Sequence, residues 1–197
     1  EVDRINELIE ELLSLARPGE TEFKDLNLAE VFDEILFLLR NTLSKKGIEV
    51  NKRYSSDRLI MVGDRSKLKQ VFLNIIINAL DSMERGGILT LEGSVLEKDL
   101  LAPNRQRFSG EEGIVVKIID SGSGIKNQDI PRIFDPFFTT KAMGSGLGLA
   151  IAHSIIKEHR GTTEVESKVG MGSVFSIFLP FNINFPKTEI PAFRMES

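Results

Sequence analysis

The sequence predicts an α+β domain in which helices cover one face of a mixed sheet. Segments with the periodicity of amphipathic helices alternate irregularly with short β-branched and apolar runs, without the strict strand–helix–strand repeat of a parallel α/β fold. Of the 197 residues, 41% are hydrophobic, which is enough for a core. The chain contains no cysteine, so disulfides and thiolate metal sites are excluded.

The elements are predicted in chain order from these patterns. We expect strands over residues 22–27, 48–54, 59–62, 88–96, 114–119, 162–167 and 174–179. We expect helices over residues 28–45, 65–84 and 147–159, with a short helical piece at 128–134. Asp64 is placed to cap the second helix, and the first should bury a stripe that includes Ile35 and Leu38.

The N-terminal residues have a pattern of their own. Apolar residues alternate at spacings of three and four, the seam of a helical bundle, at Val2, Ile5, Ile9, Leu12 and Ala16. Because Glu1 is not a natural start, we expect a bundle helix cut from a longer protein; packing onto its own domain is the alternative. The domains are therefore a bundle segment (1–19), a main domain (20–181) and a C-terminal extension (182–197).

Charge and hydropathy exclude two classes of partner. The net charge of −4 argues against a nucleic-acid module, which needs a concentrated positive face. The longest nearly apolar run, 71–80, is broken by two asparagines and is too short to span a bilayer, so we expect no direct membrane contact by these residues. The polar stretch 97–112 has no assigned role.

A helix with two asparagines is the first candidate site. Asn74 and Asn78 share one face of a mostly apolar helix with Asp81, so two amides one turn apart should be partly buried. A buried amide without a partner costs about 1–3 kcal/mol. The amides could therefore serve a ligand, because an amide oxygen suits Mg²⁺ and the NH₂ group can donate to a phosphate. A structural hydrogen bond to a neighbouring loop is equally open.

A strand that ends in an acid and a glycine-rich turn is the second candidate. Gly122 and Gly124 after Asp120 would let the backbone approach a flat ligand closely. A carboxylate there, walled by Ile125 and Ile130, could accept from the exocyclic amine of adenine. Guanine presents a carbonyl at that position, so this interpretation predicts ATP over GTP. An ordinary turn is the alternative.

The third candidate is a glycine-rich loop that opens a helix. Backbone N–H groups at a helix start form an anion site. The loop consists of Gly144, Ser145, Gly146, Leu147, Gly148 and Leu149. The preceding stretch, 134–143, is interpreted as a lid, with Phe134, Phe137 and Phe138 as hinge or packing groups and Lys141 as a candidate phosphate contact. A loop that only caps a helix remains possible.

Taken together, these segments resemble the GHKL ATPases (gyrase, heat-shock chaperone, histidine kinase and MutL), and within them the sensor histidine kinases. The resemblance covers roughly residues 22–180 and is strongest at Phe134-Asp-Pro-Phe-Phe-Thr-Thr-Lys141, Gly146-Leu-Gly148-Leu-Ala-Ile and Gly172-Ser-Val-Phe-Ser-Ile-Phe-Leu-Pro180. Residues 1–17 resemble the end of the second dimerisation helix. The resemblance implies a two-layer α/β sandwich, the Bergerat fold, with a mixed, mostly antiparallel sheet.

The resemblance also implies the ligands, ATP or ADP with Mg²⁺. By position, Asn78 would bind the metal, Asn74 would assist at the phosphates and Asp120 would hold adenine. Asp81 stands where some relatives have a basic residue, so a phosphate contact there is in doubt. The remaining implied nucleotide contacts are Gly122, Gly124, Ile125, Ile130, Thr140, Lys141, Gly144, Ser145, Gly146, Leu147, Gly148, Leu149 and Ser173.

The implied function is that of a histidine kinase catalytic domain. It would transfer the γ-phosphoryl group to a histidine outside this chain, for onward transfer to a response regulator receiver domain, in a homodimer formed by its own dimerisation bundle. His153 and His159 are not expected to be the acceptor, so no catalytic residue is assigned here. We expect a cytoplasmic location; whether the whole protein is attached to a membrane is open.

Two other functions are weighed. A GHKL-type ATP-hydrolysing switch would place a glutamate one turn before the metal-binding asparagine, to activate water. Asn74 stands there, and an amide cannot take a proton. A nucleotide-binding module without activity of its own is the third possibility.

Overall fold

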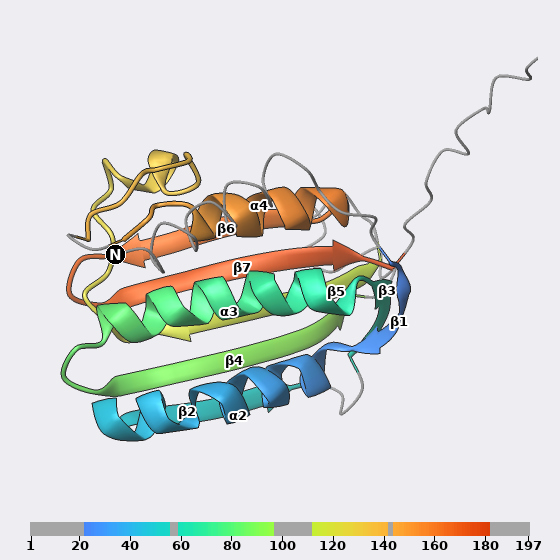
Figure 1. Ribbon diagram of the computed structural model, residues 1–197, viewed down its shortest axis with the longest axis horizontal. Helices are drawn as coiled ribbons and strands as arrows, with labels where there is room; N and C mark the ends of the chain where they lie inside the picture. Colours follow the sequence, from blue (N-terminus) through green and yellow to red (C-terminus); the bar gives the residue numbers. More distant parts are fainter. Residues whose placement is uncertain (1–21, 56–58, 97–111, 142–143, 182–197) are drawn as a thin grey trace, which may run out of the picture.

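The computed structural model describes residues 22–55, 59–96, 112–141 and 144–181. The expected helix at 1–17, the stretch 97–111 and the tail after 181 lie outside the described residues. Within the described part, a twisted sheet has three helices on one face (Figure 1). The expected α+β class is confirmed.

The sheet has five strands in the spatial order β2-β4-β5-β7-β6. Only β2 and β4 pair in parallel, and the other three pairs are antiparallel, as expected for a mixed, mostly antiparallel sheet. The strands are β2 (Ile48–Tyr54), β4 (Gly87–Leu96), β5 (Gly113–Asp120), β6 (Thr162–Lys168) and β7 (Gly172–Pro180).

The covering helices are α2 (Leu28–Lys46), α3 (Arg65–Ser82) and α4 (Gly148–Glu158). All three lie in front of the sheet in Figure 1, with α3 between the other two. The hydrophobic core lies between the layers, where Phe72 and Ile75 of α3 and Leu91 of β4 are fully buried. In the described residues, no helix is long and apolar enough to cross a bilayer.

A second, two-stranded sheet of β1 (Lys24–Asn27) and β3 (Ile60–Gly63) lies at one end of the main sheet. Asn27 connects it to α2. Its side-chain oxygen accepts from the backbone N–H of Ala29, as an N-cap, and from that of Leu59, both at 3.1 Å. One amide therefore starts the helix and holds the chain that enters β3.

Asp64 caps α3 as predicted, because its carboxylate accepts from the backbone N–H of Lys67 at 3.0 Å. Several boundaries differ from expectation by one or two residues. Helix α3 ends at Ser82, two residues early, and the helical piece expected at 128–134 is only a 3₁₀ turn, Ile130–Arg132.

One expected core position is wrong. Helix α2 buries Val31, Phe32 and Ile35, whereas Leu38 is 59% exposed. Val31 and Leu38 are two turns apart and share a face of the helix. Their burial differs because it depends on what lies opposite each turn, and helical phase does not contain that information.

Candidate nucleotide-binding site

The three predicted segments meet at one end of the molecule. The C-terminal ends of β5 and α3, and the N-terminal end of α4, lie at the left of Figure 1, together with the connection 121–147. Asp120 ends β5, and Asn78 and Asp81 belong to the last two turns of α3. The fold therefore brings together residues far apart in the sequence, by 38 positions for Ser82 and Asp120 and by 74 for Asn74 and Gly148.

Asp120 is held as a buried carboxyl group, only 4% exposed. Its Oδ1 accepts from the backbone N–H of Gly122 at 2.9 Å and from the hydroxyl of Ser82 at 3.1 Å. Burial raises the pKa of Asp120, and hydrogen bonds from Gly122, Ser82 and Ser173 oppose that rise. A carboxylate has about four lone-pair sites, and these hydrogen bonds fix the orientation of the Asp120 side chain.

The turn after Asp120 packs on the hairpin turn between β6 and β7. Gly124 has φ +70°, and a Cβ atom there would lie 2.2 Å from the carbonyl oxygen of Lys168. The carbonyl of Ser123 accepts from the N–H of Gly170 at 2.8 Å. The requirement for glycine at 124 is therefore steric as well as conformational.

Ser167, which we did not identify from the sequence, links this turn to Ser173. Its hydroxyl accepts from the backbone N–H of Ile125 at 2.8 Å and lies 3.0 Å from the hydroxyl of Ser173. Ser173 is itself the cross-strand partner of Asp120. The only signal for Ser167 is its register opposite Ser173, and that register is visible only once the strands are paired.

Asn74 makes the structural bond that we considered as the alternative to ligand binding. Its side-chain N–H donates to the backbone carbonyl of Gly148 at 2.9 Å, which ties the middle of α3 to the first residue of α4. Gly148 packs directly on this side chain, since a Cβ there would be 3.6 Å from the amide carbon of Asn74. The amide therefore positions the start of α4.

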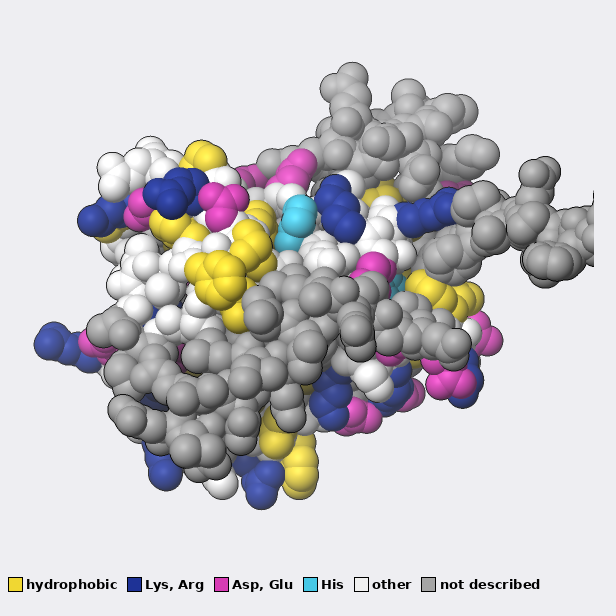
Figure 2. Space-filling view, turned by 45° about the horizontal axis from the view of Figure 1, so that its top comes forward, with side chains coloured by type: hydrophobic (Ala, Val, Ile, Leu, Met, Phe, Trp, Pro, Cys, Tyr) yellow, Lys and Arg dark blue, Asp and Glu magenta, His cyan; other side chains and the backbone are white. Residues whose placement is uncertain are grey.

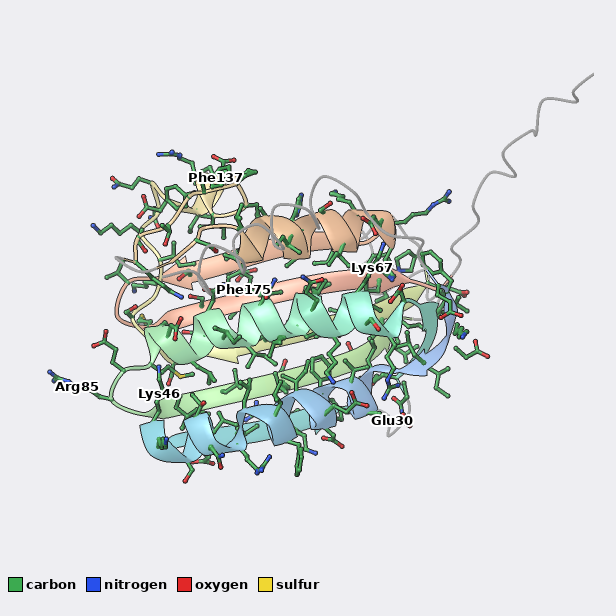
Figure 3. All side chains as sticks on the ribbon, viewed as in Figure 1. Glu30, Lys46, Lys67, Arg85, Phe137 and Phe175 are labelled. Carbon is green, nitrogen blue, oxygen red and sulfur yellow. The ribbon has the colours of Figure 1, made fainter. Side chains whose placement is uncertain are left out.

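Asn78 and Asp81 both contact the ammonium group of Lys141. The Lys141 Nζ atom donates to Asn78 Oδ1 at 2.7 Å and to Asp81 Oδ2 at 2.8 Å. Lys46, labelled in Figure 3 near the end of α3, lies 3.7 Å from the other oxygen of Asp81 and donates to the carbonyl of Leu80 at 2.7 Å. Two cations thus surround Asp81, and Lys46 was not identified from the sequence.

The glycine-rich loop leads into α4 as expected. The hydroxyl of Ser145 accepts from the N–H of Leu147 at 3.3 Å, and Leu147 provides no side-chain cap. The first N–H groups of a helix have no partner inside the helix. The start of α4 therefore retains backbone donors for an anion.

The phenylalanine segment is only partly packed. Phe134 stacks on His153 with ring centroids 4.8 Å apart, and Arg132 lies 4.7 Å from the centre of the Phe138 ring. Phe137 differs, because it is 64% exposed, has φ +67° and projects away from the sheet in Figure 3. Its backbone N–H donates to the carbonyl of Gly146 at 3.0 Å, so its main chain supports the loop while its side chain is largely exposed.

Two further expected contacts lie in the connection between β5 and α4. Ile130 is half-buried in the 3₁₀ turn, and the hydrogen bonds that fix Asp120 come from other residues. Thr140 is exposed, and the hydroxyl that accepts from the Lys141 N–H, at 3.1 Å, belongs to Thr139.

Charge on the surrounding surface is mixed. Figure 2 turns the side with α4 toward the viewer, and its coloured atoms show lysine and arginine interspersed with aspartate and glutamate. Attraction for an anion is therefore local, at the start of α4 and at Lys141.

Comparison with known proteins identifies the family. Residues 63–183 match the family model described as histidine kinase-, DNA gyrase B- and HSP90-like ATPase. The chain is 33% identical over 182 residues to the sensor histidine kinase ZraS of Klebsiella oxytoca, covering 92% of this chain and 37% of ZraS. It is 34% identical over 181 residues to sporulation kinase C of Bacillus subtilis, with coverages of 91% and 39%. It thus spans well under half the length of these relatives.

Solved structures give the same result. The catalytic domain of histidine kinase ThkA superimposes with a TM-score of 0.68 at 29% identity, covering 81% of this chain and 96% of that one. Full-length ShkA in complex with AMPPNP gives 0.75 at 25% identity, with coverages of 91% and 36%. ThkA in complex with the response regulator TrrA gives 0.72 at 26%, with coverages of 92% and 48%. This chain therefore belongs to the histidine kinase-, DNA gyrase B- and HSP90-like ATPase family, as an ATP-binding catalytic domain of the sensor histidine kinase type.

Proposed function

We propose that this chain binds Mg²⁺–ATP and presents the γ-phosphoryl group to a histidine that lies outside these residues. Phosphoryl transfer needs positioning and charge neutralisation more than covalent chemistry from the protein. The attacking imidazole brings its own lone pair, so the chain need not supply a base. Its residues have to bind the nucleotide, orient it and stabilise its charge.

The observation that favours transfer over hydrolysis is the amide at position 74. A water-activating group one turn before Asn78 would have to accept a proton, and the amide of Asn74 cannot. Its NH₂ group is also engaged, since it donates to the carbonyl of Gly148 at 2.9 Å. Asn74 thus supports the geometry of the loop, and an attacking water would find no base there.

Asp120 is the group that we assign to adenine. A buried carboxylate at a strand end can accept a hydrogen bond from an exocyclic amine. Hydrogen bonds from Ser82, Gly122 and Ser173 fix the orientation of this carboxylate before a ligand binds. Preorganised acceptors cost little to align on binding. This supports a preference for adenine over guanine nucleotides.

Asn78 is the residue that would hold magnesium. Its Oδ1 accepts a hydrogen bond from the ammonium group of Lys141 at 2.7 Å. The oxygen therefore faces a position that a positively charged group can occupy. Amide oxygens are hard ligands suited to Mg²⁺. When bound, the ion would neutralise phosphate charge.

The partners follow from the relatives. A histidine kinase was solved with its response regulator, and we infer that a receiver domain accepts the phosphoryl group from the protein to which this chain belongs. We also infer dimerisation through the protein's own helical bundle, to which residues 1–19 would contribute, and a cytoplasmic location for this domain.

The decisive experiment mixes this chain with labelled ATP, Mg²⁺ and a separately made dimerisation bundle. We expect acid-labile phosphohistidine on the bundle, and none when the bundle's acceptor histidine is replaced by glutamine. Rapid, steady phosphate release by the chain alone would instead assign it to the ATP-hydrolysing switches.

A further inference from the structure

Asn78 and Asp81 point two oxygens at one cation. They are three residues apart on α3 and therefore lie on the same face. Both oxygens contact a single atom, Lys141 Nζ, at 2.7 and 2.8 Å. An amide oxygen and a carboxylate oxygen that converge on one positive charge form a cation site. In this structure the ammonium group of Lys141 occupies that site.

The two oxygen ligands of this cation site suit a divalent ion better than an ammonium group. Mg²⁺ prefers oxygen ligands, usually one or two protein groups completed by substrate phosphates and water. The described residues contain no group of three or more acids and histidines that could hold a metal alone, so the nucleotide would have to complete the coordination. The carboxylate would add the negative charge that Asn78 lacks.

The contacts that hold Lys141 in this cation site are exposed to solvent. The side chains of Lys141 and Asp81 are 41% and 44% exposed, and an ion pair this open to solvent contributes little to stability. Lys46 would remain beside Asp81, because its ammonium group is also bonded to the carbonyl of Leu80 at 2.7 Å. Replacing the Lys141 ammonium by a metal ion therefore disrupts only exposed contacts.

We propose that Asp81 is a second protein ligand of the nucleotide-bound magnesium ion, and that the Lys141 ammonium group occupies the same cation site when no metal is present. The proposal rests on the proposed nucleotide-binding function and deepens it. It gives a role to an acidic residue at a position where a basic phosphate contact was in doubt. Lys141 becomes a competitor of the metal.

The test measures binding of a fluorescent ADP analogue to the full chain across a range of Mg²⁺ concentrations. Asp81→Ala, which removes both oxygens, is made in a Lys141→Met background, so that removing the lysine's partner cannot change the result through the lysine. We expect the Mg²⁺ midpoint to rise at least about tenfold relative to Lys141→Met alone. Lys141→Met by itself should lower the midpoint, because no ammonium then competes.

Two controls separate a ligand from a nearby charge. Asp33→Asn removes an exposed acid of α2, paired with Lys52 at 2.8 Å, and should leave the midpoint unchanged. At about 0.5 M salt, long-range attraction between exposed charges is screened, whereas a direct ligand is still needed. The Asp81 effect should therefore persist at high salt.

The failures are distinguishable. If the parent chain responds to Mg²⁺ but Asp81→Ala has the same midpoint in the Lys141→Met background, or its effect vanishes at high salt, Asp81 is no ligand. If Lys141→Met raised the Mg²⁺ midpoint, the proposal that Lys141 competes with the metal ion would be wrong. If the parent chain binds no ADP at any Mg²⁺ concentration, the proposed function itself fails.

Discussion

The imidazole of His159 bridges two helices through Asp64. Its Nε2 atom accepts from the backbone N–H of Asp64 at 3.0 Å, and its Nδ1 atom lies 2.8 Å from the carbonyl oxygen of Ile155. A carbonyl can only accept, so Nδ1 must bear the proton, and a neutral ring is the one state that satisfies both bonds. The ring is fully buried, and it joins the end of α4 to the start of α3. His159 is therefore a structural group.

This geometry makes folding stability depend on pH. Burial lowers the pKa of His159 below its ordinary value of 6.5, against opposing contributions from Ile155, Asp64 and Glu158. The unfolded chain is then protonated first as pH falls. The contribution is fully present above about pH 6.5 and is lost as pH falls toward the lower folded pKa, at no more than about 1.4 kcal/mol per pH unit.

Urea unfolding between pH 7.5 and 5.5 measures this effect, and the wild-type midpoint should fall over that range, with roughly one proton involved for each buried histidine. The His159→Gln variant should be less stable but flatter in its pH response. Burial also lowers the pKa of His153, so His153→Gln measures the part of the pH response that comes from this second histidine. An equal slope in His159→Gln and the wild type would contradict the assignment.

Replacing Asp120 with Asn should weaken ADP binding by at least about 1.4 kcal/mol, one tenfold step. The amide keeps the shape but loses the charge and half of the acceptor sites. Calorimetry measures the change, with Asp33→Asn as a surface control. Because burial raises the pKa of Asp120, wild-type affinity should also decline as pH falls toward that pKa. Unchanged ADP affinity would remove Asp120 from the site.

Replacing Asn74 with Ala should destabilise the domain by about 1 kcal/mol, because the carbonyl of Gly148 loses its donor. The start of α4 would also be held less firmly, so nucleotide affinity should fall with stability. Thermal unfolding with and without ADP measures both quantities. Asn127→Ala, at an exposed position, is the control and should change neither. Normal stability in Asn74→Ala would show that the bond is dispensable.

Two glycines in the adjoining turns separate steric conflict from backbone strain. Gly124 and Gly170 have φ of +70° and +78°, but only at Gly124 would a Cβ meet another atom, the Lys168 carbonyl at 2.2 Å. Gly170→Ala should cost about 1 kcal/mol from the left-handed backbone alone. Gly124→Ala should cost clearly more and displace the turn beside Asp120. Equal unfolding midpoints for the two variants would show that the turn yields without cost.

The local features of this fold could be predicted from the sequence. Asp64 was identified as a helix cap, and the segment that ends at Asp120 was identified as a strand. These features depend on neighbours a few residues away, through helical phase, strand alternation and capping bonds. The order of the three motifs also identified the family, and with it the expected nucleotide.

Only the tertiary structure decided which partner each polar group has. Three sets of hydrogen bonds join residues far apart in the chain. They run from Asn74 to Gly148, from Ser82 to Asp120, and from Lys141 to Asn78 and Asp81. The exposure of Leu38 likewise depends on what lies opposite it. Sequence fixes the chemistry and the phase of a side chain, whereas its contacts depend on how the helices pack on the sheet, and that packing is a property of the whole chain.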